Sequence, residues 1–512
     1  MQRLFQQVIA SSSLLRSPSF NLLFVVVVFA QFSDRAIAAE RPNIIVVLAD
    51  DLGYGDVQPL NPDSQIQTPN FGRLARLGVK FTDAHTPSAV CTPTRYGLLT
   101  GRYCWRTRLK RGVLNGYGEP LMDAANQNIA SVFSDAGYHT AVVGKWHLGL
   151  GLAKGESADE VDLSVPLTHH PGTVGFDNSF VIPASLDFPP YAFFQNGKAT
   201  SSETRMIEAS KFPVFYRKGP MASDFKMVEV MDRFVDEASA EILAMGERDK
   251  PSLLYVPLPS PHKPVLPAKR FRGKSPVGTY GDYVIQTDDA IGQILDSIEK
   301  ANIADNTWLF VTSDNGSYMY RYGAGAPDHT TDETIQGYAE DHHRSNGPWR
   351  GTKADIWEAG HRVPFFVVGP TSQKYTSKKI SKPVGLVDVF STAVELAGIE
   401  LPSGASPDGV SFASMVVGSD DQEKTNRRPL ILHSASGMFA IRSGRWKYVL
   451  GNGSGGREKP KGKPFDGQWP LFDLKADPAE TTDVSVDHQD VVKRLRRQFE
   501  RLAGDDLPAA FR

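Results

Sequence analysis

Acidic and amide side chains follow two of the apolar runs in this sequence. Asp50 and Asp51 come directly after one run, and Asp314 and Asn315 follow another. Adjacent carboxylates repel one another unless a cation neutralises them, and hard oxygen ligands favour Ca²⁺ or Mg²⁺ over zinc. Asp, Asn and Gly also begin turns routinely, so either pair alone is more simply explained as a turn. With two pairs at strand ends of one sheet, a metal site and ordinary turns are both open.

Basic side chains flank other apolar runs. Lys145 and His147 follow one run, His262 follows the next, and Lys353 precedes a further one. Around a divalent cation, such residues could bind a tetrahedral oxyanion and stabilise the charge that builds on its oxygens during transfer. Taken singly, a lysine at a strand end is an ordinary surface residue and a histidine between prolines is an ordinary loop residue. These residues gain meaning only if the fold brings them to the acidic pairs.

The 512 residues include two cysteines, Cys91 and Cys104, which exclude a disulfide framework and a cysteine-rich zinc site. Cys91 lies where a loop runs into a predicted short helix. A helix N-terminus lowers the pKa of a thiol and favours a thiolate nucleophile. The alternative is that Cys91 is a small buried hydrophobe.

A sheet is needed to bring these residues together, and the apolar pattern predicts one. Continuous apolar runs are typical of strands buried on both faces, and amphipathic stretches such as 283–298 lie between them. Strands that alternate with helices predict an α/β fold with a large central, mostly parallel mixed sheet flanked by helices. Ligands of such sheets gather at the carboxyl ends of the strands. The predicted strands are residues 44–48, 140–143, 253–256, 308–312 and 365–368.

The pattern changes near residue 428. Residues 438–442 and 445–450 flank a Ser-Gly turn and predict a hairpin, and a charged helix is expected at 491–502. We therefore expect a main domain at 39–427 and a smaller C-terminal α+β subdomain with an antiparallel sheet at 428–512.

The N-terminus predicts export. Basic residues precede an apolar run at 22–30, and a small-residue pattern follows at 36–38, which is typical of a cleaved signal peptide at 1–38. The run is shorter than the roughly 20 residues that a membrane-spanning helix needs, so an uncleaved anchor is the less favoured alternative. We expect a secreted or periplasmic protein without stable membrane insertion. The 56 Lys and Arg nearly balance 58 Asp and Glu, for a net charge of −2, which argues against a nucleic-acid partner.

Several blocks of this sequence resemble the type I sulfatases, which belong to the alkaline phosphatase superfamily. The first is Cys-Thr-Pro-Thr-Arg at 91–95, which continues to Arg102, and the second is Gly-Lys-Trp-His at 144–147. The resemblance runs from about residue 41 to residue 483. Further matching blocks, at 43–51, 313–316, 350–364 and 471–478, follow the family's order.

The resemblance implies that a maturation enzyme converts Cys91 into Cα-formylglycine. One oxygen of the aldehyde hydrate would attack sulfur, and the second hydroxyl would then expel sulfate. The implied reaction is hydrolysis of a sulfate monoester, either an aryl sulfate or a carbohydrate sulfate. The implied metal is Ca²⁺, with Mg²⁺ less favoured, and its implied ligands are Asp50, Asp51, Asp314, Asn315 and the modified Cys91.

The resemblance also implies roles for the polar residues around this centre. His262 is the candidate to protonate the leaving alcohol, and His147 is the candidate to take a proton from the hydrate. A bridge to Cys91 would consume the precursor of the nucleophile, so Cys104 is expected to be a free, buried thiol. The other implied contacts are Arg95 and Lys145 with the hydrate, Lys353 and His262 with sulfate oxygens, and Ser185 beside the substrate.

Two other functions fit parts of this pattern. A phosphoester or phosphonate-ester hydrolase of the same superfamily would share the metal crevice, and a non-catalytic protein that binds sulfated glycans would keep Cys91 unconverted. Two-metal phosphatases need more carboxylate and histidine ligands than these blocks supply, which favours a sulfuric ester hydrolase. Two local features stay open. The polar segment 317–348 is either part of the substrate rim or a solvated loop, and His361 either approaches the pocket or packs.

Overall fold

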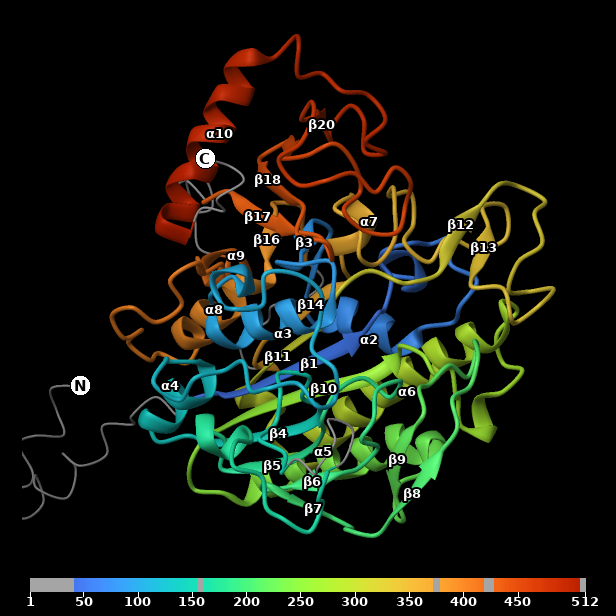
Figure 1. The fold of residues 1–512 in the computed structure, drawn as a ribbon. Helices are drawn as coiled ribbons and strands as arrows, with labels where there is room; N and C mark the ends of the chain where they lie inside the picture. Colours follow the sequence, from blue (N-terminus) through green and yellow to red (C-terminus); the bar gives the residue numbers. More distant parts are fainter. Residues whose placement is uncertain (1–40, 154–160, 372–377, 419–427, 507–512) are drawn as a thin grey trace, which may run out of the picture. The chain divides into compact units, whose positions relative to one another are not determined.

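A ten-stranded sheet forms the centre of the fold (Figure 1). The computed structural model describes residues 41–153, 161–371, 378–418 and 428–506, so the predicted leader at 1–38 lies outside the described residues. The strand order is β15-β2-β14-β11-β1-β10-β4-β5-β6-β7. In that order the strands span Lys378–Ile380, Val79–Phe81, Phe365–Val368, Thr307–Ser313, Asn43–Asp50, Ser252–Pro261, His139–Lys145, Asn178–Ile182, Phe194–Gln195 and Lys198–Ala199.

The middle of this sheet is parallel. Strands β11, β1, β10, β4 and β5 run parallel to one another, whereas β14 is antiparallel to both β11 and β2. At the other edge, β6 and β7 add two antiparallel pairings. Each predicted strand lies within an observed one, namely β1, β4, β10, β11 or β14. The expected α/β fold with a mostly parallel mixed sheet is confirmed.

Helices cover both faces of the sheet. Helices α5 and α6 pack against each other and against β10, and Figure 1 shows α3 and α8 on the opposite side of the strands from α5. The predicted helix at 283–298 lies within α6. The helices of this part of the chain are α2 (Pro69–Leu77), α3 (Cys91–Thr100), α4 (Ile129–Asp135), α5 (Val230–Glu247), α6 (Gly278–Lys300), α7 (Glu358–His361), α8 (Val389–Leu396) and α9 (Ala413–Val417).

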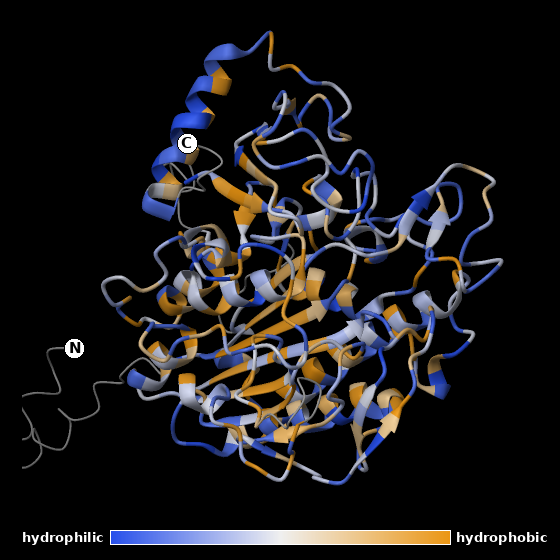
Figure 2. Ribbon diagram, in the orientation of Figure 1, coloured by the Kyte–Doolittle hydropathy of each residue, from blue (hydrophilic) through white to orange (hydrophobic). Residues whose placement is uncertain are grey.

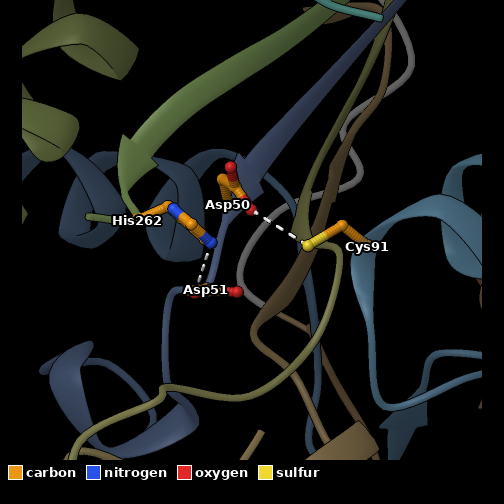
Figure 3. A group of neighbouring side chains, drawn as sticks. All are labelled: Asp50, Asp51, Cys91 and His262. Carbon is orange, nitrogen blue, oxygen red and sulfur yellow. Dashed lines mark hydrogen bonds and ion pairs between the residues drawn. The ribbon is translucent and has the colours of Figure 1, made fainter. Parts of the chain in front are cut away.

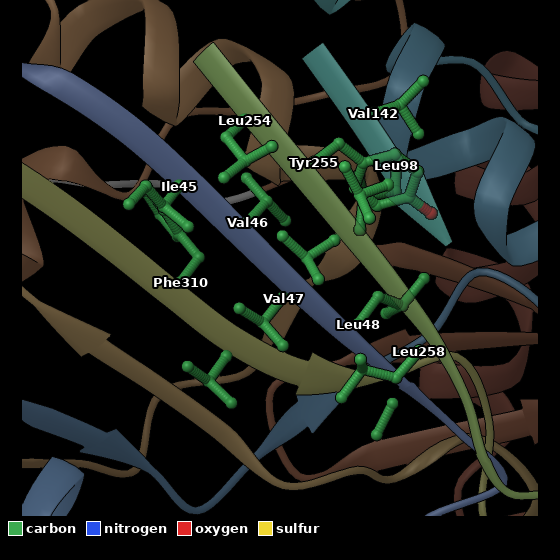
Figure 4. Packing of buried hydrophobic residues seen from close by; sticks show 14 of the residues in the cluster. Ile45, Val46, Val47, Leu48, Leu98, Val142, Leu254, Tyr255, Leu258 and Phe310 are labelled. Atoms are coloured by element: carbon green, nitrogen blue, oxygen red, sulfur yellow. The ribbon is translucent and has the colours of Figure 1, made fainter. Parts of the chain in front are cut away.

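Apolar side chains fill the interior of the central strands. Val46 of β1 lies in register with Tyr255 of β10 and with Phe310 of β11, and all three are buried. The hydropathy colouring in Figure 2 shows the same strands as the most apolar part of the ribbon, and Figure 4 shows how their side chains interlock. Because densely packed interiors resist deformation, this core fixes the positions of the strand ends.

The C-terminal part contains a separate antiparallel sheet with the order β17-β18-β19-β20. The predicted hairpin is confirmed, since β18 and β19 pair around Gly444, which has a left-handed φ of 58°. Leu495 and Phe499 of the last helix are buried in one cluster with Phe439 of β18. These elements are β17 (Leu430–His433), β18 (Phe439–Ser443), β19 (Trp446–Val449), β20 (Leu471–Asp473) and α10 (Gln489–Ala503).

Three small two-stranded sheets complete the description. They pair β12 (Tyr320–Tyr322) with β13 (Gly337–Ala339), β3 (Ala84–His85) with β16 (Val384–Gly385), and β8 (Thr204–Ile207) with β9 (Gly219–Ala222).

The segment 317–348 contains the β12–β13 pair and is partly built into the protein. Tyr338 is buried, and the Nε2 of buried His343 lies 2.8 Å from the Oδ1 of Asp56. Ordering by buried side chains distinguishes this segment from a solvated loop. Within the described ranges, none of the helices has the length and apolarity to cross a bilayer.

Candidate active site

The register between β1 and β11 brings the two acidic pairs together. Ala49 lies opposite Ser313, so Asp50 and Asp314 leave the sheet at the same edge. The Asp314 amide donates to the Ala49 carbonyl at 3.1 Å, and the Asp51 amide donates to Asp314 Oδ1 at 3.2 Å. Asp51 takes a left-handed φ of 64°, which turns the chain sharply as it leaves the strand.

The acidic residues suit a divalent cation. Asp50, Asp51, Asp314 and Asn315 are all fully buried, and Asn315 Oδ1 has no hydrogen-bond partner among the described residues. Burial, followed by repulsion from Asp314, raises the pKa of Asp50 to about 7. A bound cation would relieve that repulsion, and three carboxylates with an amide oxygen form a hard donor set.

Cys91 lies beside this acidic group, as Figure 3 shows. It is the first residue of α3, with its Sγ 3.6 Å from Asp50 Oδ1. Ligand atoms of Asp50, Asp51, Cys91 and His262 all lie within 4.8 Å of one another. Burial and the neighbouring Asp314 raise the pKa of the Cys91 thiol, so the expectation of a lowered thiol pKa at this helix N-terminus is wrong for the unmodified residue. Cys104 is a free, buried thiol, as predicted.

Three buried cations surround the acidic group. Arg95, one helical turn after Cys91, donates to Asp314 Oδ2 through Nε at 3.0 Å and through Nη2 at 2.8 Å. Lys145, the last residue of β4, places Nζ 2.5 Å from Asp50 Oδ2. Lys353 places Nζ 2.6 Å from Asp51 Oδ1. The acidic and basic residues that the sequence singled out therefore share one site.

Two histidines complete this site, and their hydrogen bonds fix which ring nitrogen can act. His147 Nε2 lies 2.7 Å from the Leu114 carbonyl and donates to it, whereas Nδ1 has no partner among the described residues. His262, just beyond β10, has Nδ1 at 2.5 Å from the Lys263 carbonyl, which leaves Nε2 facing Asp51 Oδ2 at 3.5 Å. Burial lowers the pKa of both histidines, with Lys145 acting on His147 and Lys353 on His262.

Two further positions were named from the sequence, Ser185 as a substrate contact and His361 with its role left open. Ser185 is buried, but its Oγ has no hydrogen-bond partner within the described part of the chain. His361 is also fully buried, and its Nδ1 lies 2.9 Å from the Nδ1 of His85 while its Nε2 lies 3.0 Å from Lys447 Nζ. His361 thus packs into a network with the C-terminal sheet.

One contributor was not predicted from the sequence. The ring centroid of Tyr318 lies 6.1 Å from that of His262, and the Tyr318 hydroxyl donates to the Pro261 carbonyl at 3.2 Å. Tyr318 belongs to the segment 317–348, whose polar composition gives no periodic signal that singles out one tyrosine. It supports the strand end that carries His262.

Comparison with known proteins agrees with the geometry. The Sulfatase family model matches residues 42–399. An N-acetylgalactosamine-6-O-sulfatase of Bacteroides thetaiotaomicron is 31% identical over 507 residues, which cover 90% of this chain and 93% of that protein. Human arylsulfatase G is 28% identical, over 92% of this chain and 89% of that protein.

A solved structure is also similar to this chain over most of its length. A Bacteroides thetaiotaomicron structure, described with the metabolism of multiple glycosaminoglycans, has a TM-score of 0.78 and 31% identity, and covers 91% of this chain and 99% of that one. The solved structure shares the expected α/β fold, and the names of the sequence relatives describe hydrolysis of sulfate esters. The chain belongs to the sulfatase family and is a sulfuric ester hydrolase.

Proposed function

We propose that this protein is an exported carbohydrate sulfatase that uses Cα-formylglycine, formed from Cys91 by a maturation enzyme, together with Ca²⁺. The observation that carries the proposal is the position of Cys91. Its Sγ lies between the carboxylate of Asp50, at 3.6 Å, and the ammonium of Lys353, at 3.4 Å. A group at this position contacts a proposed metal ligand, Asp50, and the cation proposed for the sulfate oxygens, Lys353.

One relative supports the proposed substrate class. The N-acetylgalactosamine-6-O-sulfatase matches this chain over nearly the whole length of both proteins. We therefore take 6-O-sulfated N-acetylgalactosamine as the first substrate to test. An aryl sulfate serves as a second substrate that makes no sugar contacts.

Formylglycine supplies the nucleophilic hydroxyl of its hydrate, and Ca²⁺ neutralises the carboxylates and the sulfate charge. The metal would be held by Asp50, Asp51, Asp314 and the unpartnered amide oxygen of Asn315. Arg95 holds Asp314 through two donors and so fixes the orientation of that carboxylate.

The remaining roles, sulfate binding and proton transfer, are assigned to a lysine and two histidines. Lys353 Nζ binds a sulfate oxygen, and His147 Nδ1 accepts a proton from the side chain at position 91. His262 donates Nδ1–H to the Lys263 carbonyl, so Nε2 is the atom that gives a proton to the leaving alcohol. Burial lowers the pKa of His262 in the free protein, and the negative charge of a bound sulfate ester favours its protonated form.

The proposal is tested by mass spectrometry and by rate measurements. The tryptic peptide that contains residue 91 should carry the mass of formylglycine, and converted protein should release sulfate from N-acetylgalactosamine 6-sulfate. Cys91→Ala should release none. Turnover of an aryl phosphate above that of the matched aryl sulfate would instead support the phosphoester hydrolase. Full sulfatase activity in Cys91→Ala would overturn the assignment of the nucleophile.

A further inference from the structure

Four side chains beside the active site form a wall in which cations alternate with aromatic rings, and we name Phe188, Arg217, Phe215 and Lys263 the cation–aromatic wall. The Cζ of Arg217 lies 3.9 Å from the ring centroid of Phe188 and 5.2 Å from that of Phe215. The Nζ of Lys263 lies 4.4 Å from the ring centroid of Phe215. All four are at least partly exposed, in contrast to the buried catalytic group.

Two members of the cation–aromatic wall lie next to the two active-site histidines. Lys263 follows His262 directly in the chain, and the ring centroid of Phe188 lies 6.2 Å from that of His147. His262 is the residue proposed to protonate the leaving alcohol. The wall therefore borders the space into which the alcohol portion of a substrate extends.

The two cations of the wall have different partners. Arg217 places Nη1 2.6 Å from Oδ2 of the buried Asp187, and its backbone amide donates to the Asp187 carbonyl at 3.2 Å. This carboxylate compensates Arg217 and holds it in place. Lys263, by contrast, has no ion pair with a carboxylate among the described residues. Its neighbour Arg457 adds like charge.

Partial burial also destabilises the charged form of Lys263. Burial lowers the pKa of Lys263 to about 8, with Asp187 opposing that shift and Arg457 and Lys353 adding to it. A half-buried cation without an ion-pair partner gains more from an incoming anion than a solvated surface lysine does. Arg217 is already matched, so Lys263 is the member of the wall that can recruit an anion.

We propose that Lys263 binds a second anionic group on the substrate, a carboxylate or another sulfate carried by the departing alcohol, so that the enzyme prefers esters of acidic saccharides. This inference rests on the proposed function and deepens it. Phe215 contacts both Lys263 and Arg217, and Asp187 holds Arg217 in place. The ester sulfate itself is bound separately, by Lys353.

The test compares substrates that share one ester and differ in their other charge. N-acetylgalactosamine 6-sulfate carries only the ester. Its disaccharide with a uronic acid adds a carboxylate, and its 4,6-disulfate adds a sulfate, so the two sources of negative charge are measured separately. For at least one of these acidic substrates, wild-type kcat/KM should exceed that of the monosulfated sugar by about tenfold at low salt, and added salt should reduce the ratio.

The readout for each variant is this ratio rather than absolute activity. Lys263→Met keeps the aliphatic stem and should bring the ratio close to one, whereas Lys263→Arg should keep it above one. The matched control is Lys226→Met, which removes an exposed lysine paired with Glu229 at 3.2 Å and should leave the ratio unchanged. Melting temperatures confirm that each variant is folded.

The outcomes separate the two proposals. If Lys263→Met and wild type show the same ratio while both hydrolyse the monosulfated sugar, the role of Lys263 is refuted and the sulfatase proposal stands. Wild type that favours neither acidic substrate refutes it in the same way. If formylglycine-containing wild type hydrolyses none of the sugars, the carbohydrate sulfatase proposal fails and this inference fails with it.

Discussion

The ammonium of Lys353 lies 3.4 Å from the Sγ of Cys91 and also contacts the carboxylate of Asp51. A single cation thus contacts both the proposed nucleophile position and a proposed metal ligand. We propose that the same ammonium binds the incoming sulfate.

Lys353→Met should reduce kcat/KM by about 10²–10³-fold on both aryl and sugar sulfates, because a preorganised cation at the developing charge is removed. The loss should be the same for good and poor leaving groups, since Lys353 is proposed to bind the sulfate and not the alcohol. Steady-state kinetics on both substrates, with formylglycine content measured in the same samples, check this. A loss confined to one substrate would contradict the assignment.

His262→Ala should instead distinguish between leaving groups. A sugar alcohol needs a proton as it leaves, whereas 4-nitrophenolate leaves readily without one. The variant should lose about 10²–10⁴-fold on the sugar sulfate and much less on the aryl sulfate. Rates across a series of aryl sulfates should show a steeper dependence on leaving-group pKa than wild type. If the rates of the variant and of wild type depended equally on leaving-group pKa, His262 would not be the general acid.

Removal of the metal should lower both activity and stability. Without a metal ion, each of the three buried carboxylates pairs with one cation, yet burial and the neighbouring Asp314 still raise the pKa of Asp50 to about 7. A chelator should lower the melting temperature by several degrees, and Ca²⁺ should restore it more completely than Mg²⁺. In Asn315→Ala, which deletes the unpartnered amide oxygen, a higher Ca²⁺ concentration should be needed for the same recovery. If the purified protein contains no calcium and a chelator changes neither its activity nor its melting temperature, the proposed calcium site is wrong.

The sequence predicted the sheet and the acidic pairs because both depend on short-range pattern. An apolar run marks a strand buried on both faces, and parallel strands end at one edge, so Asp50 and Asp314 were expected at the same edge; the adjacency of β1 and β11, which the pattern does not encode, brings them together. The pattern could not show that Arg95 would hold Asp314, since that contact joins a helix to a strand end far along the chain. The wall at Phe188, Arg217 and Lys263 depends on loop conformations, which periodicity does not encode.

His433 should make stability depend on pH. Burial lowers its pKa from 6.5 to about 4 in the folded protein. Between these two pH values, His433 is protonated in the unfolded chain but neutral in the folded protein. The free energy of unfolding therefore falls as pH drops from about 6.5 towards 4, by up to about 3 kcal/mol. Denaturant unfolding of wild type and His433→Leu between pH 4 and pH 8 measures the difference. Parallel pH profiles for the two proteins would exclude this role.

Lys447 should be the most costly position to change in the C-terminal sheet. Its Nζ lies 3.2 Å from Glu358 Oε1 and 2.7 Å from Glu480 Oε1, and all three side chains are fully buried. Lys447→Met would remove the cation that pairs with buried Glu480 and one of those that pair with Glu358, which keeps Arg362 at 3.0 Å, and should lower the free energy of unfolding by about 3–5 kcal/mol. Glu358 begins α7, which follows the segment that carries Lys353.

Because α7 directly follows the segment that carries Lys353, loss of the Lys447 ion pairs should also displace Lys353, and Lys447→Met should therefore have lower sulfatase activity. The matched control is Lys226→Met, which removes an exposed lysine from its pair with Glu229 and should change stability by less than about 1 kcal/mol. Denaturant unfolding of both variants measures the contrast. Equal effects would mean that the buried network does not hold the C-terminal sheet against α7, and the reason for a lysine at position 447 would have to lie elsewhere.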